Sequence, residues 1–252
     1  MLVTFSVSFF VFLSKEVWPF FPINKVQIFA PMRFVTEQEV EDLLTKADIS
    51  KVNFFYLDMA RIKLGLKQNY WIDDIKIARV WPDQLRIKFD EHEPLAYWNN
   101  NGIMTRQTCE IIPLDNNLKN NKLETNLARL SGANLPKLVG KEENSKKLCD
   151  ILEKLKISIK PIDIEIKKLS LSNRGSWYLE LTNGLIILLG KKDILNRTDL
   201  FVSFFLKLKE LKKTSITSFE DNKIAYIDMR YNNGLAVGAV IKTSLNELVE
   251  TA

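Results

Sequence analysis

The sequence predicts an α+β protein in which an N-terminal membrane anchor precedes a small α+β unit and a larger, mainly β domain with an exposed C-terminal edge strand. Three observations predict this arrangement. The first residues form an uncharged run rich in Phe and Val, and patterns typical of strand, helix, helix, strand and strand follow it. Beyond residue 99, short apolar strand patterns separated by turns dominate. A chain of 252 residues is long enough for two such domains.

Residues 1–21 form the predicted anchor. Thirteen uncharged residues as a helix reach about 20 Å, which is short of the ~30 Å hydrocarbon core, so the span must continue to Phe21 or residues are missing from the start. A buried core strand is the alternative, whereas a cleaved signal peptide would need a basic start and a small-residue cleavage site. The residues expected in the membrane are Leu2, Val3, Phe5, Val7, Phe9, Phe10, Val11, Phe12 and Leu13, with Trp18 at the interface.

Residues 22–92 form the predicted small unit. A strand pattern at residues 25–30 precedes a helix opened by Thr36 and Glu39, which have capping-box spacing, and Asp58 is a plausible N-cap for the second helix. Strand patterns follow at residues 71–81 and 84–98, joined by a turn at Pro82. The expected core consists of Val26, Ile28, Val40, Leu43, Leu44, Ile62, Ile75, Ile77, Leu85 and Ile87.

Residues 93–242 form the predicted β-domain, and residues 243–252 form a C-terminal tail. The domain is expected to contain a hairpin at 99–115, an amphipathic helix at 145–156, strands at 163–172, 176–183 and 185–190, and a helix at 194–211. Its closing hairpin spans 226–241, where Asn232, Asn233 and Gly234 indicate a tight turn. The last strand carries neither charge nor proline, so it is either a free sheet edge or a strand inside the sheet covered by the long helix.

Composition excludes several classes of function. Hydrophobic residues make up 46% of the chain and charged residues 27%, as in folded proteins. The net charge is +5, but lysines and acidic residues alternate, so we expect no nucleic-acid binding. The single histidine, His92, lies between two glutamates without a motif that would supply a nucleophile or a metal site. We therefore expect no enzyme activity, no metal and no cofactor.

The two cysteines, Cys109 and Cys149, are too few for a metal site of their own and lack the CxxC spacing of a redox motif. A disulfide is possible in an oxidising compartment, while buried free thiols are the commoner outcome. The sequence leaves this choice open.

Four segments give the chain a resemblance to a known family. These are "FPINKVQI", "ARVWPDQLRIKFDEHEPLAYW", "GSWYLELTNGLIILLGKKD" and "IAYIDMRYNNGLAVG", which occur in the family's order and spacing. The chain resembles the bacterial cell-division family FtsQ, called DivIB in Gram-positive bacteria. The resemblance implies one transmembrane helix, a POTRA domain and a β-domain. The basic tail that precedes the membrane helix in this family is absent, so we expect the start of the chain to be either truncated or misassigned.

The resemblance also implies partners and a binding site. The partners would be FtsB and FtsL, which dock in a ternary complex, and other divisome proteins that contact the POTRA domain. A strand of FtsB would add to the last strand of the β-domain, with Lys191 facing a carboxylate on the partner. Ala239 departs from the family, where an aromatic residue is frequent. The partner-binding residues are Lys191, Arg230, Tyr231, Asn233, Gly234, Leu235, Val237 and Ala239.

The resemblance therefore implies a non-enzymatic divisome scaffold that links early and late division proteins and controls septal peptidoglycan synthesis. It would be a single-pass protein of the cell inner membrane, with most of the chain in the periplasm at the septum. A POTRA-containing component of a transport or secretion system is the alternative, and such a protein would need tandem POTRA repeats or a membrane barrel. A periplasmic hydrolase is disfavoured because the sequence supplies no nucleophile and base.

Overall fold

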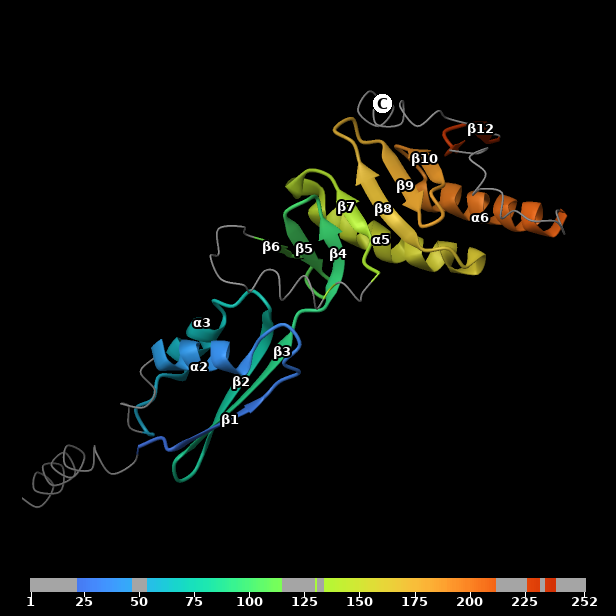
Figure 1. The fold of residues 1–252 in the computed structure, drawn as a ribbon. Helices are drawn as coiled ribbons and strands as arrows, with labels where there is room; N and C mark the ends of the chain where they lie inside the picture. The colour runs from blue at the N-terminus through green and yellow to red at the C-terminus, as the bar shows by residue number, and fades with distance from the viewer. Residues whose placement is uncertain are drawn as a thin grey trace, which may run out of the picture. The chain divides into compact units, whose positions relative to one another are not determined.

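The structure is a computed structural model that describes residues 22–46, 54–114, 130, 134–211, 226–231 and 234–238. The described chain forms two compact units, the first ending at His92 and the second beginning at Glu93. Each unit has its own sheet and its own helices (Figure 1). Each is therefore described by itself.

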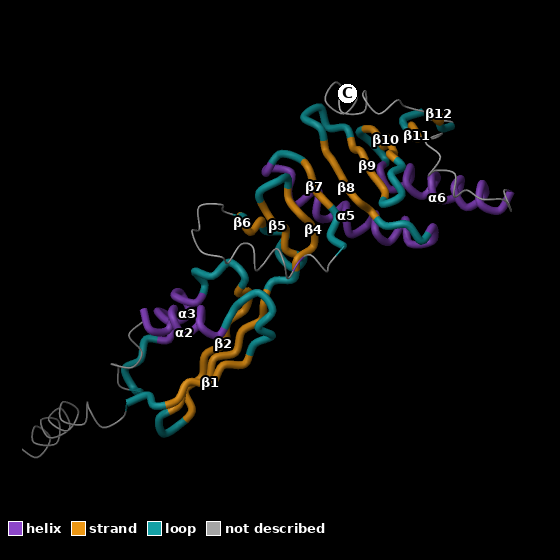
Figure 2. The backbone as a smooth tube through the Cα atoms, in the orientation of Figure 1, coloured by secondary structure: helices purple, strands orange, loops and turns teal. Residues whose placement is uncertain are grey.

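The first unit contains three strands and two helices in the order that the sequence predicts. The elements are β1 (Lys25–Phe29), α2 (Glu37–Lys46), α3 (Met59–Leu66), β2 (Ile72–Val80) and β3 (Gln84–Glu91). The sheet order is β1-β3-β2, with β1 parallel and β2 antiparallel to the central β3. Both helices lie on the same side of this sheet (Figure 2).

Side chains begin both helices of the first unit as predicted. The Glu39 backbone N–H donates to Thr36 Oγ1 over 3.3 Å, and the Thr36 N–H donates back to Glu39 Oε2 over 3.4 Å. Asp58 Oδ1 accepts from the Arg61 N–H over 3.1 Å at the start of α3. These bonds satisfy backbone donors that the first helical turn leaves unpaired.

The buried carboxylate of Glu91 fixes the segment that leads into α2. Its two oxygens accept from the backbone N–H groups of Arg33, Phe34 and Val35 over 2.8, 3.1 and 2.8 Å. This role could not be read from the sequence, because the three donors lie more than fifty residues away along the chain. Glu91 thus has a structural role in the first unit.

Two expectations for the first unit were wrong in detail. Val26 was expected in the core, but it is 37% exposed because β1 is an edge strand of the described sheet, in which β3 alone lies beside it. The strand expected over residues 84–98 breaks at His92 and Glu93, and its second part, β4, belongs to the other sheet. The imperfect alternation in β2 corresponds to a register shift between Ile72 and Ile75, which is typical of a bulge.

The second unit is built on a nine-stranded sheet with the order β12-β11-β10-β9-β8-β7-β4-β5-β6. The strands are β4 (Pro94–Trp98), β5 (Gly102–Thr105), β6 (Ile111–Pro113), β7 (Lys137–Val139), β8 (Ile166–Leu171), β9 (Trp177–Leu181), β10 (Ile186–Gly190), β11 (Tyr226–Asp228) and β12 (Ala236–Gly238). The helices are α5 (Ser145–Ile159) and α6 (Ile194–Leu211), with short 3-10 turns η3 (Glu142–Asn144) and η4 (Lys160–Ile162). The predicted mainly β character with two α-helices is confirmed.

The core of the second unit lies between the sheet and its two helices. Leu148, Leu152 and Leu155 line one face of α5 and are fully buried, as the helical stripe predicts. They pack in one cluster with Leu179 and Ile187 of the sheet. Figures 1 and 2 show α5 and α6 on the same side of the sheet. Burial of this cluster holds the nine strands in one layer.

The prediction of a tight turn in the closing hairpin was wrong. β11 and β12 are antiparallel, but their pairing ends at Asp228 opposite Ala236, so residues 229–235 connect them instead of a two-residue turn. Met229 continues towards β10, because its N–H donates to the Leu188 carbonyl over 3.0 Å. That bond draws the chain away from β12 before Asn232, which lies outside the described residues with Asn233.

No helix in the described ranges is both long and apolar enough to cross a membrane. The predicted anchor, residues 1–21, lies outside those ranges.

Candidate docking edge of the large sheet

Strand β12 lies at one end of the large sheet, and within the described residues β11 is the only strand beside it. The pairs are Tyr226 with Gly238, Ile227 with Val237, and Asp228 with Ala236. Val237 is 47% exposed, although it is apolar. The described part of the sheet therefore ends in a short strand with an exposed aliphatic side chain.

The backbone of Val237 points out from the sheet. In a strand the N–H and C=O groups of successive residues point to opposite sides. Because the Met229 N–H bonds to β10, Ile227 also presents its backbone groups to β10, and the groups of Asp228 face β12. Ile227 and Val237 are thus a non-hydrogen-bonded pair, and the N–H and C=O of Val237 face the side of β12 away from β11, where the described residues supply no further strand.

The ring of Tyr226 crosses the backbone at Gly238. A Cβ added to Gly238 would collide with the tyrosine ring and hydroxyl, so this position requires glycine. An aromatic ring laid over a glycine of the neighbouring strand is a known way to support such a strand. Tyr226 thereby stabilises the last described pair of the edge.

An ion pair follows β11 directly. Arg230 Nη2 lies 2.8 Å from Asp228 Oδ2, Nε lies 2.9 Å from Oδ1, and the Arg230 backbone N–H also donates to Oδ1 over 2.9 Å. Burial by itself raises the pKa of Asp228, but these hydrogen bonds outweigh it and hold the pKa below its ordinary value. The same bonds raise the pKa of Arg230. The carboxylate is therefore charged although its side chain is only 7% exposed.

Arg197 of α6 joins this pair to β10. Its Nη1 donates to the Leu189 carbonyl over 2.6 Å, and its Nη2 donates to the Arg230 carbonyl over 3.4 Å. Gly190 makes room for it, because a Cβ there would lie 2.6 Å from Arg197 Nη1, and φ at Gly190 is +74°. Arg197 and Asp228 were not identified as site residues from the sequence. The only signal for Asp228 was its Asp-x-Arg spacing with Arg230, which places both side chains on one face of an extended strand.

The structure brings part of the predicted site together. Lys191 follows Gly190 directly and is exposed, and Arg230 packs close to Gly190. Tyr231, the next residue, is 60% exposed. Further along, Gly234 is exposed, whereas Leu235 packs against the core cluster. Asn233 and Ala239 lie outside the described residues, as do the membrane-anchor residues Leu2, Val3, Phe5, Val7, Phe9, Phe10, Val11, Phe12, Leu13 and Trp18.

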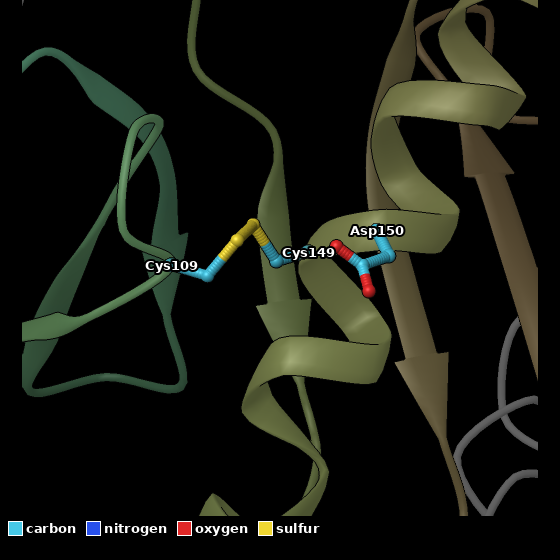
Figure 3. A group of neighbouring side chains, drawn as sticks. All are labelled: Cys109, Cys149 and Asp150. Atoms are coloured by element: carbon cyan, nitrogen blue, oxygen red, sulfur yellow. A yellow bond between two sulfur atoms is a disulfide. The ribbon is translucent and has the colours of Figure 1, made fainter.

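The cysteines form a disulfide, which settles the alternative that the sequence left open. Cys109, in the loop between β5 and β6, bonds to Cys149 of α5. Asp150 is the third member of this group; it is exposed, and one of its carboxylate oxygens lies within 4.8 Å of the two sulfurs (Figure 3). Sulfurs joined in a disulfide are not thiolate ligands, so this cluster does not fit a metal.

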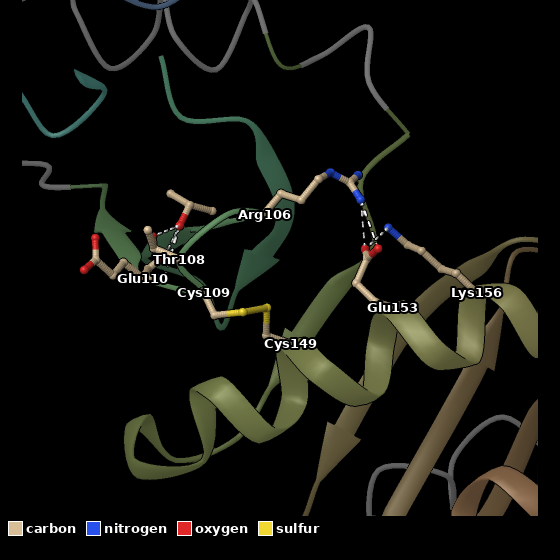
Figure 4. The surroundings of a disulfide bond; sticks show 8 residues. Arg106, Thr108, Cys109, Glu110, Cys149, Glu153 and Lys156 are labelled. Atoms are coloured by element: carbon tan, nitrogen blue, oxygen red, sulfur yellow. Dashed lines mark hydrogen bonds and ion pairs between the residues drawn. A yellow bond between two sulfur atoms is a disulfide. The ribbon is translucent and has the colours of Figure 1, made fainter. Parts of the chain in front are cut away.

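Ionic contacts surround the disulfide. Arg106 Nη1 lies 3.0 and 3.1 Å from the Glu153 carboxylate oxygens, and Lys156 Nζ lies 3.7 Å from Glu153 Oε1 (Figure 4). Burial lowers the pKa of Lys156, although Glu153 favours its charged form. The disulfide and the Arg106–Glu153 pair together fasten the β5–β6 loop to α5.

His92 has a position typical of a strand end. It is 7% exposed, its N–H donates to the Trp71 carbonyl over 2.9 Å, and its Nε2 lies 3.9 Å from Asp73 Oδ1. Its neighbour Glu91 is occupied by backbone donors. These contacts describe a structural role.

Comparisons with known proteins cover both units. The family profile described as "POTRA domain, FtsQ-type" matches residues 21–92, and the profile "Cell division protein FtsQ/DivIB, C-terminal" matches residues 96–230. Cell division protein FtsQ of Actinobacillus pleuropneumoniae serotype 3 is 28% identical over 218 residues, which are 86% of this chain and 86% of the relative. The protein of the same name from Haemophilus influenzae is 28% identical over 219 residues, 87% of this chain and 78% of the relative.

Proposed function

The chain belongs to the FtsQ/DivIB family of cell-division proteins, and from this we propose that it is a non-enzymatic scaffold that receives a strand of an FtsB-type partner at β12. In this proposal it forms a complex with FtsB and FtsL, links early and late division proteins and controls septal peptidoglycan synthesis. Residues 1–21 anchor it as a single-pass protein of the inner membrane, with the POTRA domain (22–92) and the β-domain (93–242) in the periplasm at the septum.

The outward backbone of Val237 carries this proposal. An unpaired N–H and C=O at a sheet edge form a template on which another strand can pair. Strand addition satisfies these groups, and alternate side chains on the added strand select the partner. The exposed Val237 side chain adds apolar area that the partner would cover.

Charged and aromatic groups flank the template. Tyr231 is exposed just after β11, and interface positions of this kind are often tyrosine. Lys191 and Arg230 place positive charge beside it, which favours a partner segment that carries carboxylates. The Asp228 carboxylate neutralises Arg230 in part, so Lys191 is the stronger attraction for the partner.

A proline at Val237 tests the edge directly. Val237→Pro removes one outward N–H without breaking a bond to β11, so the fold should survive while binding falls at least tenfold. Val237→Ala is the matched control, because it shortens the same side chain but keeps the N–H. The measurements are a pull-down and a binding titration with the periplasmic segment of the partner, with circular dichroism to check folding.

The two variants separate the contribution of the Val237 backbone to partner binding from the contribution of its side chain. Strong loss in Val237→Pro with little loss in Val237→Ala supports strand addition. A folded Val237→Pro protein that binds as tightly as the unchanged chain would refute the edge as the site. The alternative role in transport gains no support, since the profile matched by the second unit is that of the FtsQ/DivIB C-terminal domain.

A further inference from the structure

The turn between β2 and β3 lies at the end of the first unit where the described chain begins (Figure 1). The Asn24 N–H donates to the Asp83 carbonyl over 3.0 Å, and the Asn24 side chain donates to Asp83 Oδ2, also over 3.0 Å. Asn24 is only three positions after Phe21, the last residue of the proposed anchor, so at most about 10 Å of extended chain lies between them. The turn is thus held close to the point where the chain leaves the anchor.

Trp81 stands exposed on this turn. It is 73% exposed, whereas Trp71, Trp98 and Trp177 are 6%, 3% and 1% exposed. The protein therefore buries every other tryptophan in its described part. An indole at the level of lipid headgroups keeps its ring out of water and its N–H hydrated, which is why tryptophan gathers at membrane interfaces. Trp18 and Pro19 repeat the Trp-Pro pair of Trp81 and Pro82 within the segment predicted to meet that interface.

Charge is distributed unequally along the small sheet. Lys25 and Arg86 are exposed near the turn, where Asp83 is the nearby acid, whereas the Arg79 guanidinium donates to the Leu57 carbonyl over 2.6 Å. Asp73, Asp74, Asp90 and Glu91 lie at the opposite end of β2 and β3. β2 alone has nine residues and spans about 30 Å, so these ends are well separated. An anionic bilayer surface would attract the basic end and repel the acidic end.

We infer that the Trp81–Asp83 turn rests in the headgroup layer of an anionic membrane, with Trp81 inserted at the interface and Lys25 and Arg86 facing lipid phosphates. The inference depends on the proposed membrane anchoring of residues 1–21. The anchor and the turn then give the POTRA domain two contacts with the bilayer. Two contacts restrict the orientation of the domain, which a single flexible connection does not.

Fluorescence quenching by spin-labelled lipids tests this contact in the full chain. Trp81→Cys is labelled with an environment-sensitive dye, and the protein is placed in lipid nanodiscs that contain phosphatidylglycerol. The native cysteines are joined in a disulfide, so only the new thiol reacts under non-reducing conditions. Tyr70→Cys is the matched control, because Tyr70 is 63% exposed and lies just before the acidic end of β2.

Lipids with a shallow spin label should quench the dye at position 81 and leave the dye at position 70 unaffected. Quenching at 81 should weaken in discs of neutral lipid, where the basic side chains find no net charge. An unquenched dye at 81 in protein that stays with the discs overturns the interfacial contact and leaves the anchor intact. Protein that does not associate with the discs overturns the anchor, and the inference with it.

Discussion

Single side chains decide how the end of the large sheet is held. Asp228, Arg230 and Arg197 connect β11, the segment after it and α6 through hydrogen bonds of 2.6 to 3.4 Å. Gly190 and Gly238 are required by close neighbours, and the positive φ at Gly190 adds a second reason there. Substitution of any of these residues would disturb β12 indirectly, through the contacts that hold β11 and β12 in the sheet. Variants that test partner binding are therefore better placed at residues of β12 whose groups point away from β11.

Acid should weaken the second unit through Asp228. Its pKa in the folded protein is lowered, so the stability it contributes is complete above the unfolded value, near pH 4, and is lost as the pH falls through the folded value. Arg230→Gln should lower the free energy of unfolding by about 1–2 kcal/mol at neutral pH, because Arg230 is half exposed. Urea unfolding of both proteins between pH 2 and 7 should show a shallower acid decline in the variant. Parallel declines would assign the acid effect to other carboxylates.

Lys191 and Lys192 form a matched pair of positions at which the attraction to carboxylates on the partner can be tested. Both are exposed, but only Lys191 directly follows Gly190, close to which the Arg230 side chain packs. Lys191→Glu should weaken binding of the FtsB-type segment about tenfold at low salt and less at high salt, because salt screens exposed charges. Lys192→Glu should have a smaller effect in the same titration. Equal losses would indicate a general charge effect and no specific contact at Lys191.

Whole elements could be predicted from the sequence where the signal is local. The caps at Thr36 and Asp58 and the apolar stripe of α5 depend on neighbours within one or two turns, so the helices were placed well. Pairing between distant segments could not be derived in the same way. The parallel pairing of β10 with β11, which draws Met229 away and opens the closing hairpin, depends on the connection through α6. The disulfide joins residues forty positions apart, and spacing alone does not fix such a pair.

The candidate site likewise contains residues that the sequence indicated and residues that it did not. Val237 lies in the last strand, which the sequence marked as a possible edge because it has neither charge nor proline, and Tyr231 was implied by the family resemblance. Arg197, by contrast, reaches the site from a helix more than thirty residues earlier. Which way the backbone of Val237 points could not be read from sequence. A one-residue change of register would reverse it.

The disulfide should stabilise the second unit and leave the first unit unaffected. Closing a loop of this length limits the unfolded chain, which the chain-entropy estimate values at up to about 4 kcal/mol. Cys109→Ser with Cys149→Ala should lower the free energy of unfolding of the second unit, and the variant should no longer respond to a reducing agent. Unfolding by urea with and without dithiothreitol measures both effects. A variant that is as stable as the oxidised protein would contradict a stabilising role of the disulfide.

At the scale of the whole molecule, the two units carry different tasks in the proposed scaffold. The first unit follows the proposed anchor within a few residues, and the second bears the docking edge. Each has a core of its own. Membrane attachment and partner binding should therefore be separable by deletion.

Deletion of residues 1–21 should move the protein from the membrane fraction to the soluble fraction and preserve binding at β12. The physical reason is the loss of the long uncharged run, which is the main apolar sequence predicted to enter lipid. Fractionation followed by size-exclusion chromatography and the partner titration provides the measurement. The anchor proposal fails if the shortened, non-aggregated protein remains in the membrane fraction.

The position of β12 in the chain has a consequence for synthesis. It is the last described strand to leave the ribosome, and β11, the strand that holds it, follows α6 late in the sequence. A nascent chain that stops before Ala236 can still bury the core between the sheet and its two helices, yet it has no strand to offer at this edge. Under strand addition, the partner would thus recruit only chains whose translation has passed this point, and incomplete copies would be left out of the assembly.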